Sequence, residues 1–307
     1  MNRIFRILTY SQSIKNISKT QLPQNTPHSN REQMILLSDN QNLIRQIPYL
    51  NASKVYGKSP EYGMLNIVTV AVDNLKGFSA LVLTGDLQFR DVNKSSDSQH
   101  KLIGNVLAKE LFLLSQSKLL PAVENIGIIL AGDLYCVENL DKRGGLGDVS
   151  EVWDSFYQYF PHVMGVLGNH DSIGTLTLDK LSEFPKRYNI LHKNYVDIND
   201  VRISGISGIV GDPRRPNRVK ENEYLDAVKN LLNARSDILI THEAPKFGEF
   251  GLSGNEPYRN YLESATPTLI VCGHNHWKIP YLKLKNDTQI FNVDSRCIVL
   301  ISDNKII

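Results

Sequence analysis

The chain of 307 residues lacks a long apolar run, has only three cysteines and carries almost no net charge. No segment approaches the roughly 18–20 apolar residues that span a bilayer. Arg6 interrupts the apolar start before a signal-type hydrophobic region can form, so we expect no membrane association. The cysteines form no Cys-x-x-Cys pair, and their odd number fits reduced thiols. These absences favour a cytoplasmic protein.

The charge is unevenly distributed along the chain. Residues 1–60 contain eight Lys or Arg against two acidic residues, a net charge of +6 that leaves −4 for the rest of a +2 chain. Residues 61–307 are mildly acidic and therefore produce no positive electrostatic potential that would attract nucleic acid, so nucleic-acid binding is not expected. Residues 1–31 contain no acidic residue, which also fits an organelle transit peptide, although a polar leader is the simpler interpretation.

The length suits one α/β domain with an N-terminal addition. Residues 11–60 are rich in Ser, Asn, Gln and Pro and have few apolar positions. We therefore expect residues 1–60 to be a polar, basic, poorly ordered extension with one short helix, and residues 61–307 to form the functional domain.

Short apolar runs alternate with segments of helical periodicity in the expected domain, a pattern typical of α/β proteins. Strands are predicted over 80–84, 126–131, 163–167, 201–206, 237–240 and 268–272, and helices over 99–117, 149–159, 176–187 and 219–233. Residues 64–71 fit either an edge strand or the start of a helix. The tail, 279–302, predicts a meander of three strands.

Five of these predicted strands are followed by polar residues that can bind metals. They are Asp86 with Gln88, Asp133, Asn169, His242, and His274 with His276. In sheets of this class the carboxyl ends of the strands line one edge, where ligands bind. Carboxylate and amide oxygens mixed with imidazoles suit first-row divalent metals, whereas the absence of cysteine argues against a structural zinc site.

Each of these residues also has an ordinary structural explanation. Asp86 and Asp133 could be turn acids, His242 a satisfied interior histidine, and Gly168–Asp171 a turn with a helix cap. Five independent structural explanations, one for each polar residue after an apolar run, account for the pattern less well than one shared site does.

The motifs Gly-Asp-x-Gln, Gly-Asp, Gly-Asn-His-Asp, His and Gly-His-x-His occur in an order that resembles the calcineurin-like metallophosphoesterase superfamily, over about 80–302. The resemblance implies a two-sheet α/β sandwich flanked by helices, with a dinuclear metal site at the carboxyl ends of the strands. Asp86 and His276 would hold the first metal, Asn169, His242 and His274 the second, and Asp133 would bridge them. His170 would be the general acid or leaving-group stabiliser, with Asp171 orienting it.

The implied reaction is metal-dependent hydrolysis of a phosphoester whose identity the motifs do not specify. Two metals about 3.5–4 Å apart can share a hydroxide and clamp the attacking and leaving oxygens at phosphorus. Arg90, Arg143 and Arg296 lie next to the motifs and could contact phosphate oxygens. The loop 142–145 could face the substrate, although no Gly-Lys-Ser/Thr follows it as in a Walker loop.

The sequence departs from the family at two positions. Gln88 stands where the first motif normally has histidine, and Asp294 stands where relatives often have glycine. An amide oxygen is a weaker, neutral donor, so among Mn, Fe, Zn and Mg we favour Mn for the two divalent ions. Gln88 also leaves open a metal-binding but inactive phosphate sensor or partner-binding module. A nuclease is a third hypothesis, supported only by the basic leader.

Overall fold

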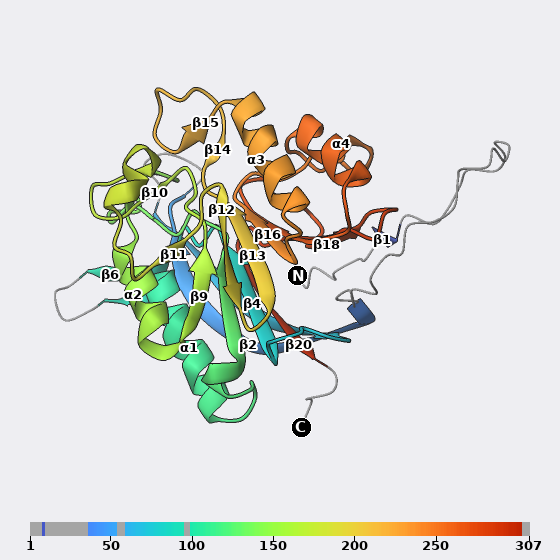
Figure 1. Cartoon of the computed structure of the whole chain (residues 1–307). Coiled ribbons are helices and arrows are strands. Elements are labelled where there is room, and N and C mark those ends of the chain that lie inside the picture. Colours follow the sequence, from blue (N-terminus) through green and yellow to red (C-terminus); the bar gives the residue numbers. More distant parts are fainter. Residues whose placement is uncertain (1–7, 10–35, 54–58, 95–98, 303–307) are drawn as a thin grey trace, which may run out of the picture.

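The computed structural model describes residues 8–9, 36–53, 59–94 and 99–302. Figure 1 shows two large sheets with helices α1 and α2 beside one of them and α3 and α4 beside the other. This mixed α/β architecture agrees with the class predicted from the sequence. No helix in the described part of the chain is long and apolar enough to cross a membrane.

The larger sheet has nine strands, in the order β11 (Asn189–Ile190), β9 (His162–Gly165), β7 (Ile126–Leu130), β4 (Ala80–Gly85), β20 (Arg296–Ser302), β3 (Glu61–Val72), β2 (Leu36–Asn51), β5 (Arg90–Lys94) and β6 (His100–Leu102). Strands β4, β7 and β9 are parallel neighbours, whereas β20 runs antiparallel to β4. The carboxyl ends of β4, β7 and β9 therefore lie at one edge.

The second sheet has seven strands, in the order β1 (Leu8–Thr9), β18 (Tyr281–Lys283), β19 (Gln289–Asn292), β17 (Leu269–Cys272), β16 (Ile238–Thr241), β13 (Val201–Ile206) and β12 (Asn194–Ile198). Strands β13, β16, β17 and β19 are parallel. Two small ladders pair β8 (Gly147–Asp148) with β10 (Asp171–Ser172), and β14 (Ile209–Val210) with β15 (Arg218–Val219).

The helices are α1 (Ile103–Gln116), α2 (Ser150–Tyr159), α3 (Glu221–Asn233) and α4 (Glu256–Ser264), with 3₁₀ turns η1 (Val123–Asn125), η2 (Leu178–Glu183) and η3 (Gly248–Phe250). Strand β4 shows how they are packed. Its Ala80 and Val82 join the core beneath α1 and α2, whereas Leu81 and Leu83 join a second core to which both sheets contribute. Both faces of β4 are covered, which explains its unbroken apolar run. A third core lies beneath α3 and α4.

Several predicted elements are wrong in detail. Residues 36–51 form strand β2 rather than a leader with a short helix, because they pair with β3 from Gln41 to Asn51 and bury Ile47. Strand β3 is internal to the sheet, between β20 and β2. The rest of the expected extension falls mostly outside the described residues.

Two further predictions fail towards the carboxyl-terminal half. The helix expected over 176–187 is only the 3₁₀ turn η2, because Phe184 precedes Pro185 and is extended. The tail forms three strands but no meander, since β18 and β19 pair in one sheet and β20 crosses to the other.

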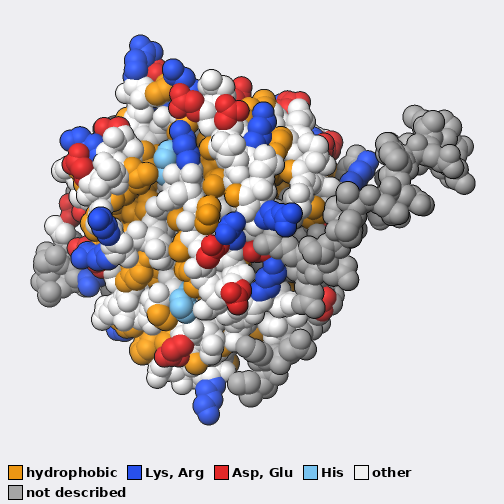
Figure 2. Space-filling view, in the orientation of Figure 1, with side chains coloured by type: hydrophobic (Ala, Val, Ile, Leu, Met, Phe, Trp, Pro, Cys, Tyr) orange, Lys and Arg blue, Asp and Glu red, His pale blue; other side chains and the backbone are white. Residues whose placement is uncertain are grey.

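Acidic and basic side chains are interspersed over the face of the molecule that Figure 2 shows.

Candidate metal centre

The five predicted strand ends come from both sheets. Asp86, Asp133 and Asn169 follow β4, β7 and β9, which are adjacent in the larger sheet. His242 and His274 follow β16 and β17, which are adjacent in the other. Because the strands within each trio or pair are parallel, each sheet brings its polar residues to one edge.

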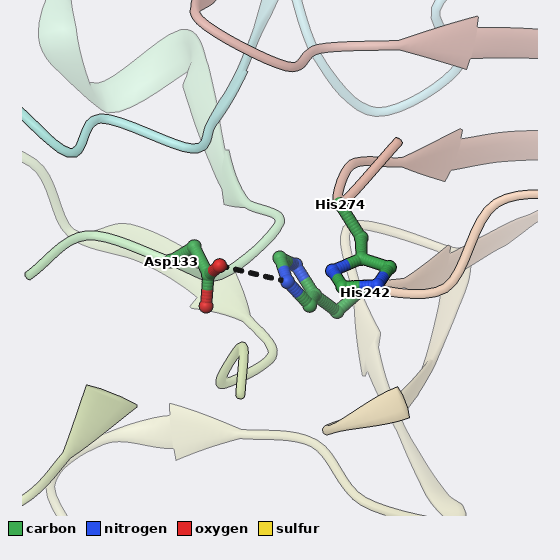
Figure 3. A group of neighbouring side chains, drawn as sticks. All are labelled: Asp133, His242 and His274. Carbon is green, nitrogen blue, oxygen red and sulfur yellow. Dashed lines mark ion pairs between the residues drawn. The ribbon is translucent and has the colours of Figure 1, made fainter. Parts of the chain in front are cut away.

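Asp133, His242 and His274 form the centre of this region. One ligand atom from each lies within 4.8 Å of the other two, and among the described His, Cys, Asp and Glu side chains they form the one group of three that meets this condition. Asp133 Oδ2 lies 3.3 Å from His242 Nε2, the contact dashed in Figure 3. Figure 3 also shows the His274 and His242 imidazoles on the same side of Asp133, with ring centroids 5.2 Å apart.

Two buried atoms at this centre lack hydrogen bonds within the described chain. They are Asn169 Oδ1 and His242 Nε2, the second of which has an ionic contact with Asp133 Oδ2 at 3.3 Å. His242 Nδ1 pairs with the carbonyl of Ala131 at 2.8 Å, so Nδ1 carries a proton and Nε2 is the nitrogen available as a ligand. Buried polar atoms normally have partners. An amide oxygen without a partner, an imidazole nitrogen and a carboxylate together form a donor set that suits a divalent cation.

The chain backbone is unusual at the ligand positions. Asp86, Asp133 and His274 have φ values of 49°, 53° and 63°, in the left-handed region. Such conformations cost about 1–3 kcal/mol and persist where the surrounding structure imposes them, often at functional sites. Gly168 and Gly273 allow this close packing, since a Cβ at either position would overlap the carboxylate of Asp133 or Asp86, respectively.

A family model for calcineurin-like phosphoesterases matches residues 79–278, a span that contains all of these candidate ligand residues. The chain belongs to the calcineurin-like phosphoesterase family. An uncharacterized protein of Haemophilus influenzae is 27% identical over 203 residues, covering 56% of this chain and 82% of that protein. The family assignment agrees with the resemblance drawn from the motifs, and it makes a divalent-metal site the natural interpretation of the Asp133 cluster.

The ionisable side chains of the Asp133 cluster shift one another's pKa values. Burial alone would lower the pKa of His242, but the carboxylates of Asp133 and Asp86 outweigh it and raise that pKa to about 10. Burial raises the pKa of Asp133, yet the cationic His242 and the nearby His170 bring it down to about 2. Burial and His242 lower the pKa of His274 to about 4. In the absence of metal, Asp133 is therefore ionised, His242 protonated and His274 neutral at pH 7.

Metal binding is expected to release at least one proton and to strengthen as pH rises. A cation must displace the proton on His242 Nε2, so between pH 6 and 8, below its pKa of about 10, apparent affinity should rise roughly tenfold per pH unit for each proton released. Calorimetric titration of Mn²⁺ in buffers of different ionisation enthalpy measures the apparent affinity and the number of protons released. Equal affinity at pH 6 and 8 would contradict the assigned charge states.

His170 lies at the edge of the Asp133 cluster. Its backbone N–H donates to Asp133 Oδ1 at 2.9 Å, and its Nε2 lies 4.0 Å from Asp133 Oδ2. Nδ1 pairs with the carbonyl of Gly145 at 2.8 Å, so Nδ1 is the donor, and Nε2 lies on a side chain that is about one-third (32%) exposed. The loop 142–145 thus positions His170.

Asp171 has a different environment from the one expected. Its carboxylate is fully buried and accepts four backbone N–H groups, from Asp133, Leu134, Tyr135 and Gly168, at 2.7–3.2 Å. Burial and the Asp133 carboxylate outweigh these bonds and raise the pKa of Asp171 to about 6. The expected orientation of the His170 imidazole by Asp171 is therefore corrected: Gly145 makes that contact, and Asp171 ties the loop after β7 to the loop after β9.

Asp171→Asn should destabilise the fold. Each carboxylate oxygen accepts two N–H groups, whereas the amide nitrogen of asparagine would face two donors. Two lost bonds to a charged acceptor cost about 3 kcal/mol or more in free energy of unfolding, measurable by urea denaturation. The exposed Asp226→Asn on α3 is the matched control, expected to change stability by less than about 0.5 kcal/mol. Equal stability of the two variants would refute this role.

Gln88, Asp86 and His276 lie around the cluster rather than in it. Gln88 Nε2 donates to Asp133 Oδ2 at 3.1 Å, and Asp86 accepts the backbone N–H of His274 at 3.0 Å. The His276 side chain is 80% exposed and pairs through Nδ1 with Asp294. Ligation by Asp86, Gln88 and His276 stays a prediction.

The three arginines proposed as phosphate contacts are engaged elsewhere. Arg90 is buried and donates to the carbonyls of Cys136, Val137 and His100, so it is neither solvated at the surface nor placed as a phosphate contact. Arg143 binds the Ala52 carbonyl and Glu61. Arg296 Nη2 donates to the Trp277 carbonyl at 2.5 Å. The cysteines Cys136, Cys272 and Cys297 are free thiols and are buried.

One positioning residue was missed by sequence reasoning. Asn217 is buried, and its Nδ2 donates to the carbonyls of Gly168 at 2.8 Å and Asp171 at 2.6 Å, so it holds both ends of the Gly-Asn-His-Asp segment. It comes from the loop before β15, 46 positions beyond Asp171. A single asparagine in a Pro/Arg-rich loop gives no sequence signal for this long-range contact.

Proposed function

We propose that the protein is a metal-dependent phosphoester hydrolase whose two sheets form the two-sheet sandwich of its family. The observation that carries the proposal is the convergence of Asp133, His242 and His274 at strand ends, beside the unpartnered Asn169 Oδ1. A bound cation would give this buried oxygen a partner, which the ion pairs of the cluster do not.

In this proposal the centre holds two divalent cations. Asn169, His242 and His274 would hold one, Asp86 and His276 the other, and Asp133 would contact both. Bound cations would activate the attacking water and neutralise charge on the phosphoryl group. The protein's part is to fix the ligands: Ala131 holds the His242 ring through Nδ1, and Asp86 accepts the His274 backbone N–H.

His170 is proposed to assist the leaving group. The Gly145 carbonyl keeps the proton of the neutral ring on Nδ1, and the backbone bond to Asp133 keeps the residue beside the centre. When Nε2 is also protonated, it can donate to the oxygen that leaves phosphorus and thereby avoid a free alkoxide.

The proposal is tested with the full chain, stripped with chelator and reloaded with Mn²⁺, Fe²⁺, Zn²⁺ or Mg²⁺. Each form is assayed against p-nitrophenyl phosphate and bis(p-nitrophenyl) phosphate across pH 5–9. We expect turnover of at least one ester that is lost on chelation and restored by metal, with Mn²⁺ the most effective. No hydrolysis of either ester with any metal would refute the hydrolase.

Gln88 supports a second candidate, a metal-binding phosphate sensor or partner-binding module without turnover. Its amide replaces a stronger imidazole donor and is hydrogen-bonded to Asp133. Metal analysis separates the two proposals. One bound ion per chain without hydrolysis would favour the sensor, whereas two ions with hydrolysis would exclude it.

A further inference from the structure

Asp294 is a buried carboxylate beside the proposed first metal position, and the family motifs assign it no role. Its side chain is 5% exposed, and its Oδ2 pairs with His276 Nδ1. His276 itself is 80% exposed. A buried, charged acceptor therefore anchors one nitrogen of an otherwise exposed ring, leaving Nε2 as the nitrogen with a free lone pair.

The backbone holds Asp294 in this place. A parallel bridge joins Asp294 to Gly85, and Ser295 N–H donates to the Gly85 carbonyl at 3.2 Å. On the other side, the Asp294 carbonyl and the Asn292 side chain both accept from Arg296 Nη1, at 3.2 and 3.0 Å. Asp294 therefore lies beside Gly85, the residue that precedes Asp86. The bonds to Gly85 and Arg296 hold its segment in place.

Gln88 explains why an additional carboxylate would matter here. A neutral amide oxygen is a weaker metal ligand than an imidazole nitrogen, and the Gln88 amide nitrogen already donates to Asp133. A histidine that gives its second N–H to a carboxylate is oriented, fixed in tautomer and more basic as a ligand. Asp294 would strengthen His276 in this way, on the side of the centre that Gln88 weakens.

We propose that Asp294 is a positioning residue that presents His276 Nε2 to the first metal and offsets the loss of the imidazole at position 88. This inference rests on the proposed metal centre. It concerns affinity and ligand geometry, and it predicts that Asp294 acts through His276 rather than by an independent contact.

Mn²⁺ binding to the full chain, measured by calorimetry and by electron paramagnetic resonance of free Mn²⁺, tests the proposal. Asp294→Asn should weaken the lower-affinity of two sites by roughly 10–100-fold and leave the other unchanged. In a His276→Ala background the same substitution should have no further effect, because the group it positions is gone. Gln88→His should restore much of the affinity of Asp294→Asn.

The exposed Asp287→Asn serves as the matched control and should bind Mn²⁺ like the parent chain. Unchanged Mn²⁺ affinity in Asp294→Asn would overturn the proposal, as would a further loss in the His276→Ala background. Equal weakening of both sites, with a lower melting temperature of the metal-free protein, would overturn it in favour of a purely structural role. Failure of the parent chain to bind Mn²⁺ would refute the metal centre itself, so the two failures are distinguishable.

Discussion

Asp133→Asn is expected to reduce phosphoester hydrolysis by about a thousandfold or more, since the proposed metals would supply several kcal/mol of transition-state stabilisation and each 1.36 kcal/mol is a factor of ten. The carboxylate lies 3.3 Å from His242 Nε2 and accepts the backbone N–H of His170. An amide would keep the size of the side chain but remove the charge between the two proposed metals. Steady-state kinetics and bound-metal analysis measure the effect.

The substitution must be separated from misfolding, because Asp133 is buried. Thermal unfolding of the metal-free variant gives that measurement, and Asp226→Asn on the exposed face of α3 gives the matched change of acid to amide. A folded Asp133→Asn protein that kept both metals and full activity would contradict a bridging role.

His170→Ala is expected to lower kcat by roughly 10²–10⁴-fold while leaving metal content unchanged, which is the usual contribution of general acid catalysis. The size of this loss in kcat should depend on the leaving group of the substrate. An ester with a poor leaving group needs protonation of the departing oxygen, whereas p-nitrophenolate leaves readily without it. The defect should therefore grow as the leaving-group pKa rises across a series of aryl and alkyl phosphates.

His162→Ala is a suitable control for His170→Ala. His162 begins strand β9, at the opposite end from the polar edge, and packs edge-on against Phe78 with ring centroids 5.8 Å apart. We expect its loss to leave kcat nearly unchanged. The same defect of His170→Ala for good and poor leaving groups would contradict proton donation and indicate a role in binding.

The sequence predicted the strands of the site well because their signal is local. Strands β4, β7, β16 and β17 are buried on both faces and read as short apolar runs ended by Gly-Asp, His or Gly-His. The chemistry of each end residue is also local, so Asp133, His242 and His274 could be identified before their proximity was known.

The features that escaped prediction depend on distant partners. Half of the residues of strand β2 are polar, and the strand is stabilised by its ladder with β3, which no composition rule detects. The carbonyl that orients His170 belongs to Gly145, 25 positions away, and every residue has a carbonyl. Backbone groups and long-range amides such as Asn217 leave no residue-specific trace, so their roles require the structure.

Helix α4 is an exception, because its first turn has a local sequence signal. Asn255 accepts the N–H of Tyr258 at 2.7 Å as the N-cap, and Pro257 lies in the first turn. Asparagine followed by Glu-Pro is a typical helix start. The apolar content of the segment is low, and only Tyr258 and Leu262 are buried, so hydrophobic periodicity alone did not indicate a helix.

The most direct test of the account is a crystal structure of the protein loaded with Mn²⁺, with anomalous scattering recorded at the manganese edge. We predict two peaks about 3.5–4 Å apart, with Asp133 between them, His242 Nε2 and Asn169 Oδ1 on one ion, and Asp86 and His276 Nε2 on the other. A metal at neither position, or a His242 Nε2 still paired with Asp133 at saturating Mn²⁺, would contradict the central claim.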